Sequence, residues 1–572
     1  MKLNLDFYKE ELDKKDVSDK LLEKVISYPK EDFSQLISNE SDIEEILALS
    51  DVRKNILNWY KFKENSEILE INANYGEITG LLCEKARKVV SIENSKKCAS
   101  IIEKRHKNID NLELIIGDLS QIKLERKFDY IVIIGIYNGV EQVLEYANKK
   151  IKEDGIILLA LNNKFGVKSW VTTKEQENVI NNNNISSTEE QLKKILQGKQ
   201  YNVYYPLPDY KLPNIIYTKK CMPNISNIYR NLTYKNGTVN FKEIEAYYEI
   251  IKNNPENFKN YANSFLLEIS QENIKENDIK FIAFSNMRKD EYRIQTIVKE
   301  KEVCKYSINS KSQEHIDKIK QNIETLNNIG INTLDSYQNG KIVSKYVTEP
   351  SLEDKLISIY KEQGKDQFLE QIDKFKSFLK EKLQVTEQIE QNIFTKYNVK
   401  CEGVQNLTFV KHGFWDLIFQ NCFIIENEYY FYDQEWYEQN VPIEYILYRA
   451  ILYFNESKKY ITDEEIFEYL GLTQFIHTFR ELDDKLQQKT RKDIVWKLHS
   501  TDDLEKTRQL QKEKQLQKKL QEKEYENANL KVEIEKLKME NTHHCNEIFL
   551  MKNSLSWKAT EPLRKIRGLG KK

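Results

Sequence analysis

The chain has 572 residues, a length that suggests three or four domains. Lys and Arg number 88 and Asp and Glu number 90, so the formal net charge is −2, which argues against a whole-chain polyelectrolyte that coats nucleic acid. Aromatic residues make up 11% of the sequence, too many for a disordered chain. The seven cysteines form no C-x-x-C pair, so neither a zinc site nor a disulfide framework is indicated.

The sequence does not show the patterns that direct a protein to export or into a membrane. The start of the chain is polar and acidic, unlike a signal peptide, and no apolar stretch approaches the roughly 20 residues that a membrane span needs. We therefore expect a cytoplasmic protein whose contact with a membrane is at most peripheral.

The first half of the chain changes its hydrophobic period once. Residues 1–60 are expected to form short amphipathic helices. From about 66 to 163, charged helical stretches separate the short apolar runs EILEI, VVSIE, LELIIGD, FDYIVIIGI and GIILLAL, which indicates a parallel sheet buried on both faces. Residues 164–275 are mixed: the prolines of YYPLPDYKLP argue against a central strand, and FLLEI resembles a closing strand.

A second unit starts near residue 280. FIAFSN, YRIQTIVKE and EVCKYSI are typical of antiparallel strands, and a helix at HIDKIKQNIETL and a hairpin at SYQNGKIVSKYV follow. A long helical stretch, 351–393, leads to two strand-like runs within 408–433. Residues 441–500 are expected to be helical again.

The last segment, about 502–556, is very polar and contains neither Gly nor Pro. Asn527 and Asn541 fall at a positions of a heptad repeat, where buried Asn specifies register and small oligomers. A lone solvated helix is one interpretation, but a single polar helix could not bury an apolar stripe, so we expect a coiled coil that joins identical chains. The tail 557–572 carries six basic residues and one acid. The apolar heptad positions are Leu516, Leu520, Leu530, Ile534, Leu537, Ile548, Met551 and Leu555.

A candidate cofactor site lies at the ends of the predicted parallel strands. In ILEINANYGEITGLL, a strand is followed by a turn and a helix, which together present backbone N–H groups beside a cofactor. Glu70 would face the cofactor, and Gly76 would allow a close backbone approach. Glu93, at the end of the next strand, could bind both ribose hydroxyls. Asp118 and Leu119, after the third strand, would lie beside an adenine ring.

The order, spacing and residue types of 66–163 resemble class I S-adenosylmethionine (SAM)-dependent methyltransferases, which implies SAM as the cofactor. The first turn of that family usually contains E-x-G-x-G-x-G, and here Asn72 and Asn74 replace two glycines. Asn tolerates the left-handed conformation better than other non-Gly residues, so the turn can survive with Asn72 in the cofactor site, although the side chains add bulk. A Rossmann-like scaffold without activity is the alternative. A nicotinamide site lacks the required G-x-G-x-x-G spacing.

A second constellation fits phosphoryl transfer, which needs a lysine, two metal-binding groups and a carboxylate near the acceptor hydroxyl. Asp416 precedes Asn421 by five residues, and Asp433 follows an apparent β-hairpin. This layout resembles protein kinases and, more closely, aminoglycoside phosphotransferase-like kinases. The resemblance implies that Asp416 orients the hydroxyl, that Asn421 and Asp433 hold Mg²⁺, and that Lys305 binds ATP with Glu314 as its ion-pair partner.

The kinase-like pattern departs from the family in two places. The family histidine is replaced by Phe414, and His412, four residues before Asp416, is interpreted as structural. FSNMRKDEY stands where a Gly-rich loop would cover the phosphates. The alternative interpretation makes Asp416, Asn421 and Asp433 loop caps and surface carboxylates.

The whole chain resembles the bifunctional methyltransferase–kinases that cap bacterial O-antigen chains. This resemblance implies an α/β methyltransferase domain, a two-lobed α+β kinase-like domain and a helical coiled coil, acting with SAM, ATP and Mg²⁺ on the end of a surface glycan. It also implies a glycosyltransferase or polymerase partner, and we expect the basic tail to contact an anionic membrane or that partner. The alternative is a non-catalytic or single-activity scaffold that recruits glycosyltransferases through its coiled coil. The predicted parts are 1–60, 61–277, 278–500, 501–556 and 557–572.

Overall fold

The computed structural model describes residues 1–10, 17–30, 32–37, 43–136, 139–171, 186–224, 228, 241–272, 274, 277–387, 390–454, 460–492 and 501–568. The chain forms two compact units, Met1–Leu498 and His499–Lys572. The first unit thus contains the parts predicted as N-terminal, methyltransferase-like and kinase-like.

The N-terminus begins with a strand, which corrects the prediction of helices throughout 1–60. Strand β1 (Lys2–Phe7) pairs in parallel with β4 (Leu112–Gly117) at the edge of the sheet. Gly117 permits this approach, because a Cβ there would lie 2.6 Å from the Cβ of Phe7. A contact with residues more than a hundred positions away therefore decides the structure of this segment. The expected helices follow as α1 (Asp19–Ser27), α2 (Ile43–Leu49) and α3 (Asn55–Asn58).

The predicted parallel sheet is present, with the strand order β4-β3-β2-β5-β6 and every neighbouring pair parallel. The strands are almost completely buried, as their continuous apolar runs predicted. Helices α4 (Thr79–Lys85), α5 (Lys96–His106) and α6 (Val140–Lys150) connect them. The strands are β2 (Glu67–Ile71), β3 (Lys88–Glu93), β5 (Phe128–Ile134) and β6 (Ile151–Asn163).

Beyond β6 the sheet continues through one reversed strand. Strand β10 (Ser264–Ser270), the predicted FLLEI strand, runs antiparallel to both β6 and β8 (Gln200–Leu207). The prediction that prolines exclude a strand was wrong for the start of YYPLPDYKLP, because Pro206 belongs to β8 and pairs with Ile216 of the next strand. The ladder with β10 ends at Tyr204, so the missing N–H of Pro206 costs no hydrogen bond on that side.

The same sheet extends without a break into the kinase-like part. Strand β9 (Ile215–Thr218) pairs with β8 on one side and with β11 on the other. Five antiparallel strands then follow in the order β11-β12-β13-β16-β15. Helix α13 (Gln313–Asn328) packs against them. These strands are β11 (Ile279–Phe284), β12 (Ile294–Lys299), β13 (Glu302–Ser307), β15 (Asp335–Gln338) and β16 (Lys341–Lys345).

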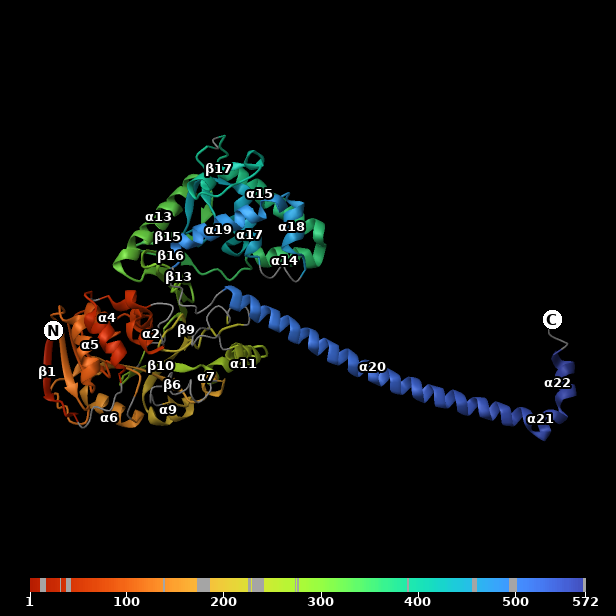
Figure 1. Cartoon of the computed structure of the whole chain (residues 1–572), viewed down its shortest axis with the longest axis horizontal. Helices are drawn as coiled ribbons and strands as arrows, with labels where there is room; N and C mark the ends of the chain where they lie inside the picture. Colours follow the sequence, from red (N-terminus) through yellow and green to blue (C-terminus); the bar gives the residue numbers. More distant parts are fainter. Residues whose placement is uncertain are drawn as a thin grey trace. The chain divides into compact units, whose positions relative to one another are not determined.

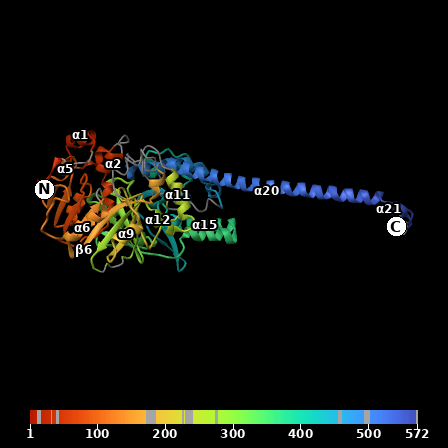
Figure 2. The same ribbon diagram turned by 90° about the horizontal axis from the view of Figure 1, so that it is seen from below.

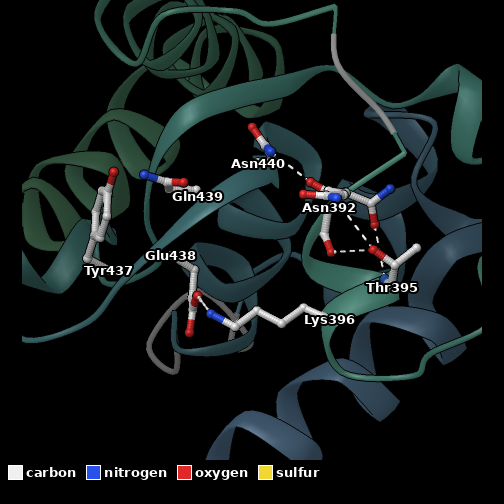
Figure 3. A pocket seen from close by; sticks show the side chains of 8 residues that line it. Asn392, Thr395, Lys396, Tyr437, Glu438, Gln439 and Asn440 are labelled. Atoms are coloured by element: carbon white, nitrogen blue, oxygen red, sulfur yellow. Dashed lines mark hydrogen bonds and ion pairs between the residues drawn. The ribbon is translucent and has the colours of Figure 1, made fainter.

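The remainder of the first unit is mostly helical. The stretch predicted to be helical over 351–393 is divided into two helices at Gly364, whose φ is +88°, and the second helix ends at Lys382. The hairpin of β18 (Cys422–Ile425) and β19 (Glu428–Phe431) is present, and β17 (Phe409–Phe414) pairs with β20 (Tyr437–Pro442) beside a polar cavity (Figure 3). The helices are α14 (Leu352–Gln363), α15 (Lys365–Lys382), α16 (Ile393–Lys396), α17 (Ile443–Leu452), α18 (Asp463–Tyr469) and α19 (Ile476–Thr490).

The second unit is dominated by one helix, α20 (Thr501–Asn553), which is uninterrupted in both views (Figures 1 and 2). Its heptad residues Leu530, Ile534 and Leu537 are 49%, 51% and 57% exposed, whereas the side chain of Leu516 lies outside the described residues. Ser554 caps α21 (Leu555–Ala559), and α22 (Glu561–Gly568) follows. Within the described residues, we find no helix with the length and apolar character to cross a membrane.

Candidate active sites

The turn after β2 has the backbone of a glycine-rich turn without most of the glycines. Asn72, Asn74 and Gly76 have φ values of +60°, +54° and +73°. The Asn74 side chain donates to the Asn72 carbonyl at 2.7 Å, and the Asn72 side chain donates to the Gly135 carbonyl at 3.2 Å. Both asparagines thus adopt the left-handed conformation and bond to nearby backbone, so the two substitutions leave the turn intact.

Glu93, at the end of β3, is fixed against this turn. Its carboxylate accepts the backbone N–H of Asn74 at 2.7 Å and that of Ser95 at 3.0 Å. The side chain is buried. Each carboxylate oxygen retains capacity to accept a further hydrogen bond, which a ribose hydroxyl could donate.

Glu70, which was predicted to face the cofactor, forms hydrogen bonds that hold neighbouring elements together. One of its oxygens accepts hydrogen bonds from Thr79 Oγ1 at 2.7 Å and from Ser91 Oγ at 2.6 Å. Burial raises the pKa of Glu70 to about 7, although the two hydroxyls oppose the shift. Glu70 therefore joins β2, β3 and α4 beneath the turn.

The remaining predicted cofactor residues lie at the same edge of the sheet. Because β2, β3, β4 and β5 are parallel, their carboxyl ends place Asn72, Glu93, Asp118 and Gly135 along one edge. Asp118 is partly exposed and accepts the Ser120 N–H at 2.8 Å. Leu119 is partly buried against the core.

Sequence reasoning missed two residues of α5 that support the turn. His106 Nε2 donates to the Gly76 carbonyl at 2.8 Å, and burial lowers the pKa of His106 to about 3, so the ring is neutral. Arg105 donates to the carbonyls of Tyr75 and Ala48, each at 2.6 Å. No spacing in the sequence marks these two residues, because basic residues in the last turn of a helix are ordinary.

In the kinase-like part, Lys305 and Asp433 meet. Lys305 of β13 forms ion pairs with Asp433 and with Glu435, the latter at 2.9 Å. Asp433 has a φ of +62°, and its N–H donates to Asp335 at 2.9 Å. A non-glycine residue held in this conformation is a form of strain that concentrates at functional sites.

The expected ion pair between Lys305 and Glu314 is absent. Glu314 is 77% exposed and pairs with Lys318 at 2.8 Å. The next residue, His315, points inward instead, because one helical position turns the side chain by about 100°. Its Nε2 lies 3.1 Å from Glu435, so Glu435 takes the place that we assigned to Glu314.

Glu435 is the anionic centre of this site. Burial raises its pKa, but Arg288, Lys305 and His315 outweigh burial and hold the pKa well below its ordinary value. Arg288 comes from the β11–β12 loop that replaces a Gly-rich loop, and its guanidinium lies 5.3 Å from the Trp436 ring. In the sequence, Glu435 follows the predicted metal ligand Asp433 by two residues, and its role was not predicted.

Asp416 and Asn421 are also brought to this site. The Asn421 side chain donates to the Asp416 carbonyl at 3.3 Å, and Gln434, next to Asp433, donates to the same carbonyl at 2.8 Å. Arg449 forms an ion pair with Asp416 at 2.9 Å. Burial raises the pKa of Asp416, although Arg449 opposes the shift.

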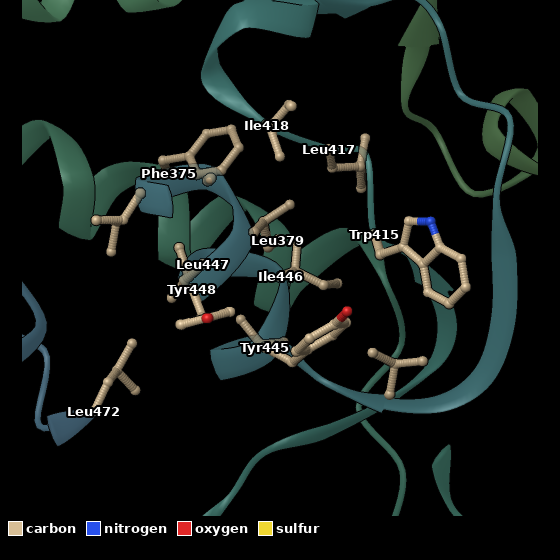
Figure 4. Packing of buried hydrophobic residues seen from close by; sticks show 14 of the residues in the cluster. Phe375, Leu379, Trp415, Leu417, Ile418, Tyr445, Ile446, Leu447, Tyr448 and Leu472 are labelled. Atoms are coloured by element: carbon tan, nitrogen blue, oxygen red, sulfur yellow. The ribbon is translucent and has the colours of Figure 1, made fainter. Parts of the chain in front are cut away.

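The loop that carries Asp416 is anchored in the largest apolar core. Trp415, Leu417 and Ile418, its immediate neighbours, are buried against α15 and α17 (Figure 4). Arg449 lies on the largely apolar helix α17. A single arginine in such a helix indicates a buried ion pair, and the sequence analysis did not use this signal.

The metal-binding hypothesis can be tested against the donors present. Asp433 and Asn421 supply oxygen donors, which Mg²⁺ prefers, and Mg²⁺ is usually held by one or two carboxylates together with water and substrate phosphates. In the described part of the chain, no group of three or more His, Cys, Asp or Glu residues is arranged as a metal site. Asp433 and Asn421 are therefore of the residue types that could hold Mg²⁺ together with water and a bound phosphate.

Comparisons with known proteins concern the methyltransferase-like part. No protein-family model matches the chain. Ribosomal RNA small subunit methyltransferase A of Syntrophus aciditrophicus is 31% identical over 97 residues, or 17% of this chain and 32% of that protein. Malonyl-(acyl-carrier protein) O-methyltransferase of Priestia megaterium is 27% identical over 125 residues, or 20% of this chain and 45% of that protein. The chain therefore spans less than half the length of these curated relatives.

Two solved structures have lower sequence identity to this chain and low structural similarity to it. Phosphoethanolamine N-methyltransferase 1 of Haemonchus contortus, in complex with phosphoethanolamine and S-adenosylhomocysteine, is 15% identical, with 46% of this chain and 51% of that chain covered and a TM-score of 0.26. A TehB-like SAM-dependent methyltransferase of Corynebacterium glutamicum is 11% identical, with 39% and 88% covered and a TM-score of 0.23. We draw no conclusion from overlaps this low.

The strand order and the sequence similarities together identify the fold. The order β4-β3-β2-β5-β6-β10-β8, with β10 as its one reversed strand, is that of class I SAM-dependent methyltransferases. The curated relatives are methyltransferases as well. This part of the chain has the class I SAM-dependent methyltransferase fold.

Proposed function

We propose that the chain is a SAM-dependent methyltransferase with a second, ATP-dependent kinase site, and that both act on the end of a bacterial surface glycan. The observation that carries the first half is the turn after β2, whose positive φ values at Asn72, Asn74 and Gly76 recreate a glycine-rich turn. The turn and Glu93 lie at the carboxyl edge of the sheet, where such folds bind their ligands.

The chain's own residues would hold SAM as follows. The turn at residues 72–76 would border its methionine part, Glu93 would accept the ribose hydroxyls, and Asp118 and Leu119 would border the adenine. When bound, SAM supplies an activated methyl group. A phosphate acceptor would need no general base, because its oxygen is already charged, so positioning would supply most of the catalysis.

The kinase half rests on the convergence of Lys305, Asp416, Asn421 and Asp433. Lys305 would bind nucleotide phosphates in exchange for its present pairing with Asp433, while Asp433 and Asn421 would hold Mg²⁺. Asp416 would orient the acceptor hydroxyl and receive its proton. Burial raises the pKa of Asp416, and a higher pKa makes a carboxylate a better proton acceptor.

The glycan assignment rests on the order of the parts and on their resemblance to chain-capping enzymes. A terminal sugar that carries a methylated phosphate can no longer be extended. The exposed heptad residues of α20 favour a homo-oligomer, and the basic tail favours contact with an anionic membrane or with a glycosyltransferase.

A second candidate function is a scaffold that lacks one or both activities. The ion pair between Lys305 and Asp433 favours it, because each group neutralises the other in the absence of nucleotide. Purified full-length protein, methyl-labelled SAM and γ-labelled ATP with Mg²⁺, supplied with lipid-linked glycan extracted from bacteria, would separate the two. Label in the glycan supports the enzyme, and binding of glycan without label from either donor supports the scaffold.

A further inference from the structure

A polar cavity of about 610 Å³ lies between β20 and the segment that contains α16. Its volume is in the range of small-molecule sites. Figure 3 shows side chains of β20, among them Tyr437, Gln439 and Asn440, opposite Asn392 and Thr395. Asn440 has a φ of +53°, an outlier of the kind that accompanies functional positions.

The cavity starts beside the proposed catalytic groups and leads away from them. Tyr437 follows Asp433 by four residues and pairs with Phe414, which precedes Asp416 by two. Asp416 lies in the turn that directly follows β17. Because β17 and β20 are antiparallel, Gln439 pairs with His412 and Asn440 lies farther from Asp416 again. A chain-like substrate whose end reaches Asp416 could therefore continue along β20.

The chemistry of the lining suits sugar hydroxyls. Side-chain amides of Asn392, Gln439 and Asn440 border the cavity. Asn392 Oδ1 caps α16 by accepting the Phe394 N–H at 2.9 Å, and Asn440 Nδ2 donates to the Gln391 carbonyl at 2.7 Å. Because amides both donate and accept hydrogen bonds, as hydroxyls do, Gln439 and Asn440 Oδ1 could bond to sugar hydroxyls. Tyr437 adds a ring face, and its hydroxyl lies 3.2 Å from His412 Nδ1, which fixes the ring's position.

The charged groups of the lining are already paired. Lys396 bonds to Glu438, which also accepts from the Tyr397 hydroxyl at 2.6 Å and pairs with Lys489 at 3.3 Å. Burial raises the pKa of Glu438, but Lys396 and Tyr397 outweigh burial and lower it, so the carboxylate stays ionised. A lining whose charges compensate one another favours a neutral ligand over a phosphate-rich one.

We propose that this cavity binds the neutral sugar units that precede the phosphorylated end of the acceptor glycan. The proposal rests on the kinase half of the proposed function. It adds the prediction that the kinase site binds sugar units beyond the terminal one. Longer acceptors should bind more tightly until the cavity is filled, with little change in the rate of the chemical step.

The test uses the full-length protein, labelled ATP with Mg²⁺, and a panel of linear oligosaccharides of one to four units built from glucose, galactose, mannose or rhamnose. For the series that is phosphorylated, KM should fall from the monosaccharide to the trisaccharide. The double variant Gln439→Ala with Asn440→Gly keeps the backbone, because glycine accepts the positive φ of Asn440. It should raise the trisaccharide KM roughly tenfold, the worth of one or two hydrogen bonds. Its kcat and monosaccharide KM should stay within about twofold.

The control is Gln363→Ala, an exposed amide at the end of α14, which should change neither constant. If phosphorylation occurs but the double variant keeps the trisaccharide KM of the wild type, the cavity proposal is wrong and the kinase proposal stands. If no sugar of the panel is phosphorylated while ATP is still hydrolysed, both the sugar acceptor and the cavity proposal are overturned.

Discussion

Asparagine can stand in for glycine where the backbone requires a positive φ, and the turn after β2 depends on this property. Asn72 and Asn74 gain a compensating hydrogen bond each, which glycine could not make. The sequence alone predicted that this turn could survive. It did not predict Glu435 or the inward position of His315. Which side chains near the start of α13 face inward depends on the elements that pack against that helix, and Glu435 reaches His315 from a segment 120 residues away.

Substitutions at Asn74 test this interpretation of the turn. Asn74→Ala should lower the free energy of unfolding of the methyltransferase part by roughly 2–3 kcal/mol, because the left-handed conformation costs an ordinary residue about 1–2 kcal/mol and a hydrogen bond is lost. Asn74→Gly should cost less, since only the hydrogen bond disappears. Urea unfolding followed by far-UV circular dichroism measures both. Equal losses for the two variants would show that the backbone conformation is not the cause.

Glu70 should make stability depend on pH. The unfolded chain releases this proton near pH 4.5, whereas the folded chain keeps it up to about pH 7. The contribution of Glu70 to the free energy of unfolding is therefore greatest below pH 4.5. It falls by up to about 3 kcal/mol as pH rises from 4.5 through 7. Glu70→Gln should flatten the unfolding free energy between these values. A variant whose pH profile matches that of the wild type would contradict the assignment.

Among the structural elements, one short segment joins the methyltransferase-like and kinase-like parts. Within residues 51–55, Asp51 pairs with Arg293 of the kinase-like part, and Arg53 pairs with Glu77 beside the methyltransferase turn at 3.3 Å. Asn55 donates to Asn286 at 2.8 Å. Local patterns predicted most strands and helices, yet β1 and the strand at Pro206 were missed, because distant pairing partners rather than local propensity determine these strands.

Asp51→Asn should destabilise the first unit. Arg293 is completely buried, so removing the charge that faces it should cost about 3–5 kcal/mol. Burial raises the pKa of Asp51, but Arg293 and Lys492 outweigh it and lower the pKa, so this stabilisation is present near neutral pH and disappears as pH falls through the folded-state pKa. Thermal unfolding at pH 7 measures the loss. As a control, Asp19→Asn removes the exposed pair with Lys97 and should cost at most about 1 kcal/mol; similar losses for the two variants would contradict the prediction.

At the level of the whole molecule, the continuous sheet links the methyltransferase-like and kinase-like parts within the first unit. In the second unit, α20 leaves the apolar side chains of Leu530, Ile534 and Leu537 about half exposed. The heptad pattern predicted the helix. Whether chains associate through it is a property of several chains, which single-chain packing does not determine.

Removal of the second unit should separate the chains. A variant that ends at residue 500 should sediment as a monomer, while the full chain should sediment as a dimer or trimer, because Leu530, Ile534 and Leu537 would otherwise stay in water. Analytical ultracentrifugation at several concentrations measures this. A full chain that sediments as a monomer would refute the coiled coil.

Calorimetric titration of the full-length protein with SAM tests the proposed cofactor site at the turn after β2 and Glu93. We expect one SAM site per chain. Glu93→Ala should lose roughly 1.5–3 kcal/mol of binding free energy, the usual contribution of hydrogen bonds to a charged group. Glu84→Ala, an exposed acid in the neighbouring helix, should bind as the wild type does. Absence of SAM binding to the wild type, or undiminished binding to Glu93→Ala, would contradict the account.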